Sequence, residues 1–574
     1  MEPRVESLAS ATPQQEKPGR NSRFASRKAF DEWLASLPLA NVTAAGNELL
    51  AGVQDLNHSK VSARFRLHAL EQVTEPCLAV VNVLDKQYHD AVFPLTDKTD
   101  KVGRTVVHFF RELAMGYRLA AHQFANESAR FSLVGKRAGG LAIHRALSCC
   151  EQLVFRCGQL FRAPPTGIWS EIHILYAFAA QNGMESRTIV DTLGWSKKSH
   201  RIEDIYKRTA LLGLCDPQRL SQRAITQVHK ACEMWRDKTT LATGKAAVGQ
   251  FAITIDDDCA PMLVLDDESP SGDFRFDLSS LKQWLQKLLS SENGSSRDIP
   301  LKSAGHETLI LDGMLLRQLT ATWGERIERR HKRLPATHKA RVVIGLNGIH
   351  FMAAGEQSFG QFLEETGNEK LTQQAGSINN WVAGSDQRFR PPQHEAEILN
   401  QSLGGYRLRF VKPQNMQIRV GELITLSTAA ISERDAIWMV AAVKWLQSPD
   451  PEEVEVGLSV VGQDVKAAAV LADLPGRRIP PARALLTRGF AANDANNQYL
   501  LVPPFHSETK VPWLTCWREE MQFHETMLQV DGLADRTTEY CRYTYAIKPS
   551  RIDGVPDLGP VPMESSGIPP LDVS

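Results

Sequence analysis

The spacing of apolar residues divides the chain into a helical first part and a strand-rich second part. Between residues 25 and 243, apolar side chains recur every three or four positions, as in TVVHFFRELAMGYRLAAHQFA and IWSEIHILYAFAA. This period places them on one face of each helix, and such faces bury against one another. Asn41 and the Pro164–Pro165 pair mark starts and breaks. The pattern predicts an all-α domain of about eight to ten antiparallel helices.

From residue 340 onward, apolar and polar residues alternate as they do in strands. Five runs carry this signal: ARVVIGLNGIHFM, AEILNQSLGGYRLRF, VGELITLS, AIWMVAAVKWL and VEVGLSVVG. Short strands separated by polar or proline-containing segments, with a helix left open only at 356–372, predict a small antiparallel barrel. Further runs follow, including RALLTRG, QYLLVPP, FHETMLQV and EYCRYTYAI. They predict either a second β module or strands that extend the first.

The segment between these two parts mixes both periods and predicts a small α/β connector. AVGQFAITIDDDCAPMLVLDDE alternates like strands, and LSSLKQWLQKLLSS has a helical stripe. Three consecutive aspartates, residues 256–258, suggest either a metal site or a solvated turn. Adjacent strand residues point to opposite faces, which favours the turn.

The fold class predicted is multidomain α+β: an all-α N-terminal domain, an α/β connector, an antiparallel β-barrel and a C-terminal β-rich module. The first residues are polar and aperiodic, which is typical of disorder. The expected boundaries are a disordered tail at 1–24, the helical domain at 25–243, the connector at 244–322, the barrel at 323–472 with an insertion at about 347–396, and the C-terminal module with a disordered tail at 473–574.

Composition excludes several classes of protein. Lys plus Arg and Asp plus Glu balance at 66 each, so any recognition of an anion must be local. A cytoplasmic protein is expected, because no long apolar run or signal-peptide pattern occurs. The nine cysteines lack any CxxC, which argues against a disulfide framework or structural zinc. No local sequence supports a catalytic triad, so no enzyme is expected.

Two stretches combine into a candidate site. A Gly-Gly pair interrupts the strand pattern of NQSLGGYRLRF, residues 400–410, which suggests a hairpin turn, a bulge or a close backbone approach. Just before the barrel, the run ERIERRHKRLP concentrates positive charge at Arg329, Arg330 and Arg333. Taken alone, this run is also typical of a solvated helix end or a nonspecific phosphate patch.

Together these stretches resemble the PilZ domain, the bacterial receptor module for cyclic di-GMP. Arg329 and Arg333 stand as RxxxR, and Asn400, Ser402 and Gly405 stand as NxSxxG. The runs VGELITL, WMVAAVKWL and VEVGLSVV resemble the later barrel strands of that family in their order. The helical part combined with such a barrel resembles a family of long bacterial PilZ proteins.

The resemblance covers roughly residues 325–470, and its spacing departs from the family in one respect. More residues separate the two motifs than is usual, so we expect an insertion at about 347–396. Its polar, Gly- and Gln-rich composition predicts a surface excursion between strands. Because this segment contains Arg388 and Arg390, either arginine is an alternative to Arg329 at the ligand.

The resemblance implies cyclic di-GMP as the ligand, with no metal or cofactor. An arginine fork holds a phosphate or the O6/N7 edge of guanine and also stacks on the base. Asparagine and serine offer polar groups to the base or phosphate, while glycines let the backbone approach a purine and turn the strand. The expected ligand-binding residues are Arg329, Arg330, Arg333, Asn400, Ser402, Gly404 and Gly405.

The function predicted is a cyclic di-GMP receptor that couples ligand binding at the barrel to a helical domain facing a protein partner. Two alternatives remain. One is a PilZ-like scaffold or protein-interaction protein that does not bind the nucleotide. The other is a nucleic-acid-binding protein using Arg329–Arg333, although no stacking aromatics accompany that run.

Overall fold

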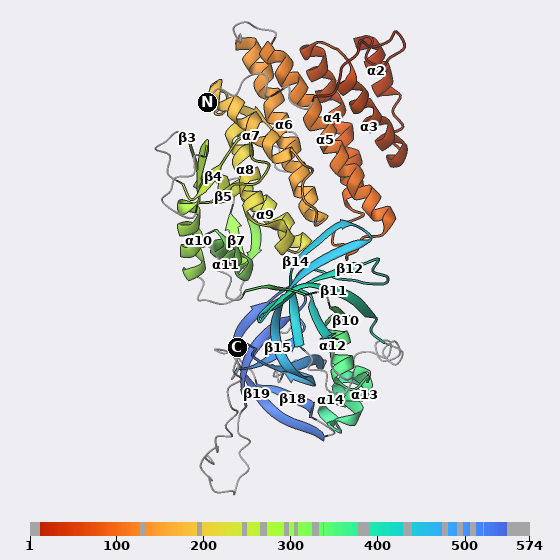
Figure 1. Cartoon of the computed structure of the whole chain (residues 1–574), viewed down its shortest axis with the longest axis vertical. Helices are drawn as coiled ribbons and strands as arrows, with labels where there is room; N and C mark the ends of the chain where they lie inside the picture. The colour runs from red at the N-terminus through yellow and green to blue at the C-terminus, as the bar shows by residue number, and fades with distance from the viewer. Residues whose placement is uncertain are drawn as a thin grey trace.

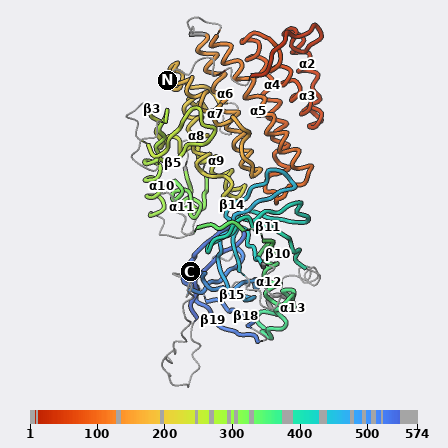
Figure 2. Tube along the Cα trace, in the orientation of Figure 1, coloured from red at the N-terminus to blue at the C-terminus, as the bar shows by residue number. Residues whose placement is uncertain are grey.

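The computed structural model has a helical half and a β-structured half. In Figure 1 the helices occupy the upper part, the connector flanks them, and the β-strands fill the lower part. Figure 2 follows the trace from the red N-terminal helices to the blue strands at the opposite end. Within the described residues, no helix has the length and apolar character to cross a membrane. The structure describes residues 8, 12–126, 133–191, 198–243, 249–264, 272–291, 298–302, 308–323, 332–336, 338–376, 390–428, 439–472, 480–490, 497–504, 512–519 and 522–547.

The helical domain follows the predicted stripes. Asn41 caps its helix as expected, because its side-chain oxygen accepts a hydrogen bond from the Ala44 N–H at 3.1 Å. The long helices α5 and α6 pack along each other, with Phe109 and Tyr117 fully buried. The helices are α2 (Arg27–Ala35), α3 (Val42–His58), α4 (Ala63–Asp85), α5 (Asp97–Asn126), α6 (Leu133–Gln159), α7 (Ile168–Gln181), α8 (Ile202–Leu214) and α9 (Gln222–Trp235), with short elements β1 (Thr188–Val190), β2 (Ser199–Arg201), η1 (Pro217–Arg219) and η2 (Arg236–Lys238) between or after them.

The expected disorder of residues 1–24 is wrong for the described part of that segment. The Glu16 N–H donates to the His58 carbonyl at 2.8 Å, and the Lys60 N–H donates to the Glu16 carbonyl at 2.7 Å. Phe24 is buried and packs against Phe30. Backbone pairing and one aromatic side chain therefore fix a segment that has no periodicity of its own.

The connector contains a four-stranded antiparallel sheet, a hairpin and two helices. The Asp258 carboxylate accepts hydrogen bonds from the Gly167 N–H at 2.6 Å and the Trp169 N–H at 3.0 Å, so it caps the start of α7. The described residues contain no cluster of three or more His, Cys, Asp or Glu side chains placed to hold a metal. The elements are β3 (Thr240–Thr243), β4 (Phe251–Ile253), β5 (Met262–Leu263), β6 (Phe274–Asp277), α10 (Ser279–Ser291), β7 (Asp298–Lys302), β8 (Thr308–Asp312) and α11 (Gly313–Thr322).

Six antiparallel strands close the first barrel, in the order β12-β11-β10-β13-β14-β15, with β15 pairing back to β12. Its interior is apolar and continuous with the core of the helical domain. The predicted barrel is confirmed. Its strands are β10 (Lys339–Ile344), β11 (Gln393–Ser402), β12 (Gly405–Val411), β13 (Leu423–Thr428), β14 (Met439–Asp450) and β15 (Glu453–Ala472), and the short strand β9 (Leu334–Pro335) pairs with β11.

A second closed barrel grows from the same long strand. The C-terminal part of β15 pairs with β16 on one side and with β18 on the other, and the ring closes as β15-β16-β17-β20-β19-β18. This barrel has its own core, which includes Trp513 and Tyr543. The predicted C-terminal β-rich module is confirmed, and it both extends the first barrel and forms a unit. Its other strands are β16 (Ala482–Arg488), β17 (Gln498–Val502), β18 (Trp513–Glu519), β19 (Gln522–Arg536) and β20 (Cys541–Ile547).

The chain after β10 differs from the sequence expectation of a strand followed by a surface excursion. The strand ends at Ile344, and three helices follow: α12 (Leu346–Ala353), α13 (Phe359–Glu365) and α14 (Glu369–Gly376). Ile349, Phe362 and Leu371 are buried. They cover apolar outer faces of the strands of both barrels, including Ala467 of β15. The surface-excursion prediction is therefore wrong for the described residues 346–376, because those strand faces need an apolar cover.

Backbone hydrogen bonds join the helical domain to the first barrel. Phe93 and Ile418 exchange two of them, at 3.1 and 3.0 Å. The Ser448 N–H donates to the Phe161 carbonyl at 3.0 Å, and the Arg162 Nε donates to the Ser448 carbonyl at 3.0 Å. Such contacts fix the position of the β14–β15 hairpin against the helices.

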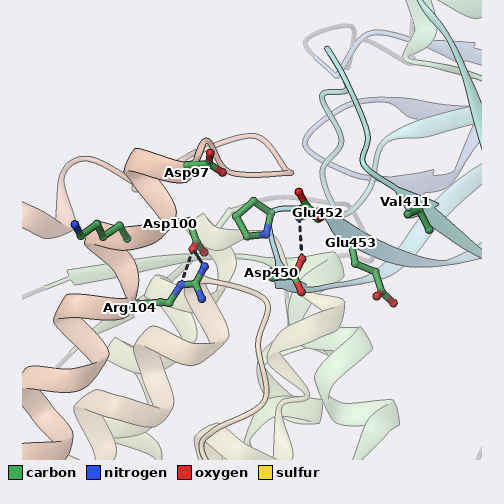
Figure 3. A pocket seen from close by; sticks show the side chains of 9 residues that line it. Asp97, Asp100, Arg104, Val411, Asp450, Glu452 and Glu453 are labelled. Carbon is green, nitrogen blue, oxygen red and sulfur yellow. Dashed lines mark hydrogen bonds and ion pairs between the residues drawn. The ribbon is translucent and has the colours of Figure 1, made fainter.

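The same junction contains a polar cavity of about 620 Å³. Figure 3 shows Asp97, Asp100 and Arg104 of α5 on one side and Asp450 of the β14–β15 hairpin with Glu452 on the other. Asp100 is buried and bonds to Arg104 at 2.6 Å, and it also pairs with Arg162. The buried carboxylate is thus compensated by arginines at the base of the hairpin.

Candidate functional site

The residues directly after Arg333 lie beside the glycine-containing strand. Leu334 pairs with Gln401, and Pro335 pairs with Asn400. The pairing extends C-terminally, because the Ile398 N–H donates to the His338 carbonyl at 2.8 Å. Arg333, adjacent to Leu334 and exposed, therefore lies at the NxSxxG strand. The end of the RxxxR motif is therefore followed at once by residues that pair with the NxSxxG strand.

Only part of the predicted arginine set is placed. Arg329, Arg330 and Arg388 lie outside the described residues. Arg390 is exposed and precedes the start of β11. The choice between Arg329 and the two alternative arginines at the ligand therefore stays a prediction.

The Gly-Gly pair belongs to a tight hairpin. β11 ends at Ser402 and β12 begins at Gly405, and these two residues pair. The Ser402 hydroxyl donates to the Gly405 carbonyl at 3.3 Å. A Cβ on Gly405 would lie 2.1 Å from the Leu458 carbonyl oxygen of β15. Gly405 is thus required by the seam that closes the barrel, and contact of Gly404 or Gly405 with a ligand stays a prediction.

Four strands place one residue each in a row on the outer face of the barrel. Asn400 pairs with Arg407, Arg407 with Gly457, and Gly457 with Trp445. Residues directly opposite in antiparallel strands project to the same face. A Cβ on Gly457 would lie 1.8 Å from the Trp445 Nε1, so the indole lies across this glycine. We call Asn400, Arg407, Gly457 and Trp445 the outer row.

The outer row combines a flat surface with polar groups. The Arg407 guanidinium carbon lies 5.7 Å from the centre of the Trp445 ring, within cation–π range. The Asn400 Oδ1 is buried and has no hydrogen-bond partner in the described part of the chain. Beside the row, Ser402, Gly405 and Ser459 pair across three strands and add only small side chains. A flat base can stack on the Trp445 ring, and an anionic group can pair with the Arg407 guanidinium.

Arg407 and Arg409 share one carboxylate. The Arg407 Nε lies 3.0 Å from one Glu455 oxygen, and the Arg409 Nε lies 3.0 Å from the other. Burial raises the pKa of Glu455, but the hydrogen bonds from both arginines outweigh it and hold the pKa below its ordinary value. Arg409 also pairs with Glu453 at 3.1 Å. The alternation of apolar and charged residues in YRLRF predicts that Arg407 and Arg409 share one face of the strand. Only the pairing register of β11 and β12 shows that Arg407 lies beside Asn400.

A closed six-stranded antiparallel barrel, in which the residues after Arg333 pair with an NxSxxG strand, is the fold expected of a PilZ domain. The family model described as the middle PilZ domain of the cyclic-di-GMP receptor FimW matches residues 250–388 and 368–466, and the model of that receptor's N-terminal domain matches residues 28–246. The chain therefore belongs to the FimW family of PilZ-domain receptors.

The chain is similar over most of its length to one curated relative. The cyclic-di-GMP receptor FimW of Pseudomonas aeruginosa is 25% identical over 483 residues, which cover 76% of this chain and 77% of the relative. No solved structure matches the chain. The second barrel lies beyond the residues that the family models match.

Proposed function

We propose that this protein is a receptor that binds cyclic di-GMP on the outer face of the first barrel. The observation that supports the proposal is the pairing of β9 with β11, in which the two residues directly after Arg333 lie opposite Gln401 and Asn400. The family membership supports the same ligand, because the relative and both family models are described as cyclic-di-GMP receptors.

The described residues suit a guanine dinucleotide. The unpartnered Asn400 Oδ1 is an acceptor, and guanine carries an N2–H₂ donor that adenine lacks. Arg333 supplies a fork for a phosphate or for the O6/N7 edge of the base. The indole of Trp445 gives a base a surface on which to stack.

We further propose that the helical domain relays binding to a protein partner. The barrel and the helices share a continuous core and exchange main-chain hydrogen bonds at Phe93 and Phe161. A ligand that changes the barrel surface therefore acts on elements already attached to the helical domain.

Calorimetric titration of the purified full chain tests the ligand. We expect saturable binding of cyclic di-GMP and much weaker binding of cyclic di-AMP and GMP, since adenine lacks the O6 acceptor and GMP carries only one base. Equal heats for the guanine and adenine dinucleotides would remove the specificity. No binding of any dinucleotide would favour a PilZ-like scaffold instead.

A further inference from the structure

The outer row continues into the helical domain. Beyond Arg407 and Trp445 lies a pocket of about 230 Å³ that joins the barrel to the turn containing η1. We propose that Arg219, at the end of η1, completes the cyclic di-GMP site by binding a phosphate or a guanine edge together with Arg407. The inference rests on the proposed function and deepens it. The pocket is lined by Asp216, Gln218, Arg219, Arg407, Trp445 and Gln447.

The η1 turn is held firmly against the barrel. The Gln447 Nε2 donates to the Gln218 Oε1 at 2.6 Å, and the next barrel residue, Ser448, bonds through its N–H to the Phe161 carbonyl at 3.0 Å. Within the turn, the Arg219 N–H donates to the Asp216 carbonyl at 2.9 Å. The backbone that carries Arg219 is thus fixed beside the outer row, and only its side chain has to move to reach a ligand.

The pocket is within reach of a ligand bound at the NxSxxG motif. Arg407 lies directly opposite Asn400 on the neighbouring strand, about 5 Å away. The same Arg407 lines the pocket that contains Arg219. A dinucleotide held by Asn400 and Arg333 can therefore extend along the outer row toward Arg219.

Of the two pocket arginines, Arg219 has a carboxylate partner that an anionic ligand can replace. The Arg219 Nε lies 2.7 Å from the Asp216 Oδ2, and the two side chains are 48% and 44% exposed. Arg407 is 38% exposed, but its partner Glu455 is only 7% exposed and also pairs with Arg409, so Arg407 meets the ligand while keeping this pair. The exposed Arg219–Asp216 pair contributes little to stability, whereas a phosphate offers an arginine fork two acceptors in matching geometry. Binding therefore exchanges the weak Arg219–Asp216 pair for contacts to the ligand.

Substitution of Asp216 provides a test in which removing a side-chain charge should increase the affinity for the ligand. Its φ of 48° is left-handed, a conformation that asparagine adopts readily. Asp216→Asn should therefore keep the turn while removing the carboxylate that competes for Arg219. If Arg219 binds the ligand, this change strengthens binding, whereas a purely structural role for the pair predicts weaker binding.

Calorimetric titration with cyclic di-GMP separates these cases, using the full chain and three variants. Arg219→Ala should weaken binding at least tenfold, and Asp216→Asn should strengthen it about threefold or more. Arg223→Ala, an exposed arginine outside this pocket, is the matched control and should stay within twofold of the wild type. Thermal unfolding of each variant verifies that it is folded.

The outcomes also distinguish the inference from the proposed function. If Arg219→Ala binds as well as Arg223→Ala while Arg333→Ala loses binding, the inference is overturned and the receptor assignment stands. Unchanged or weaker binding by Asp216→Asn also overturns it. If the wild type binds no cyclic di-GMP, both fail.

Discussion

At the scale of the residue, the unsatisfied side-chain oxygen of Asn400 gives the main energetic reason to expect a ligand. Its Oδ1 is buried without a partner in the described chain, and such an atom costs roughly 1 to 3 kcal/mol. A ligand that donates a hydrogen bond to this oxygen recovers that cost on binding. Arg407 lies opposite it, and Arg333 directly precedes the residues that pair with its strand, so a donor that belongs to an anionic nucleotide is favoured over a neutral one.

Arginine substitutions divide the binding energy. Arg333→Ala should cost about 2 to 3 kcal/mol of binding free energy, the scale of a lost charge-assisted pair of hydrogen bonds. Arg330→Ala should cost less than about 1 kcal/mol if that side chain faces solvent. Ser402→Ala should lie between them. Calorimetry with cyclic di-GMP measures all three, and a larger effect of Arg388→Ala would assign the role of Arg329 to the inserted segment.

Gly405, where β12 pairs with β15 to close the first barrel, predicts an effect on stability. Gly405→Ala would bring a Cβ within 2.1 Å of the Leu458 carbonyl oxygen, so β12 and β15 must separate. We expect a loss of about 2 to 3 kcal/mol in the free energy of unfolding. Gly360→Ala is the control, because no atom outside its own helix lies within 4 Å of the added Cβ. Equal unfolding midpoints for the two variants would contradict the role of the seam.

At the scale of elements, periodicity predicted most strands and helices and left a helix open at 356–372, where α13 and the start of α14 lie, but it did not predict α12. GLNGIHFM continues an apolar run, and strand and helix are hard to separate in short apolar runs. The apolar residues of α13 and α14 are few and spread among polar ones, so the sequence did not indicate that these helices are packed. These helices are held in place by packing on the outer faces of strands of both barrels, and the local sequence does not reveal those contacts.

Phe362 tests whether α13 is a packed element. Its side chain is fully buried among residues of α12, β15 and β18. Phe362→Ala should lower the free energy of unfolding by about 3 to 5 kcal/mol. Leu403→Ala is an apolar control at an exposed hairpin, where we expect little change. Urea unfolding measures both, and equal midpoints would show that the helix contributes no packing energy.

The candidate site was only partly predictable for a related reason. The two motifs identified Arg333, Asn400 and Ser402 from the sequence. The sequence around Trp445 and Gly457 does not indicate a role at the site, because these residues join the outer row only through the pairing register of β12, β14 and β15. Sequence period sets which face a residue occupies, while strand order and bulges decide its neighbours.

At the scale of the whole molecule, the shared strand β15 makes the two barrels one continuous structure. Its 20 residues far exceed the usual strand length, so the sequence predicted separate strands and modules. The first barrel also shares its core with the helical domain. A change at the outer row therefore acts on a connected body rather than on an isolated domain.

The contact between the barrels predicts a dependence on pH. Burial, and then the nearby Glu539, raise the pKa of Glu422 to about 7. The folded state keeps this proton where the unfolded chain has lost it, so stability should fall as pH rises from about 4.5 to 7. Glu422→Gln should remove an effect on the order of 2 kcal/mol. Urea unfolding at pH 5 and pH 8 tests it, and parallel pH profiles for wild type and variant would contradict it.

The central claim is that one ligand joins the arginine segment, residues 329–333, to the NxSxxG strand. Hydrogen exchange with and without cyclic di-GMP tests this claim most directly. Like charges at Arg329, Arg330, Lys332 and Arg333 repel one another until an anion neutralises them. The ligand should therefore slow exchange both at residues 320–345 and at residues 396–410. Protection confined to residues 396–410, with the arginine segment exchanging as fast as before, would contradict the account even if the nucleotide binds.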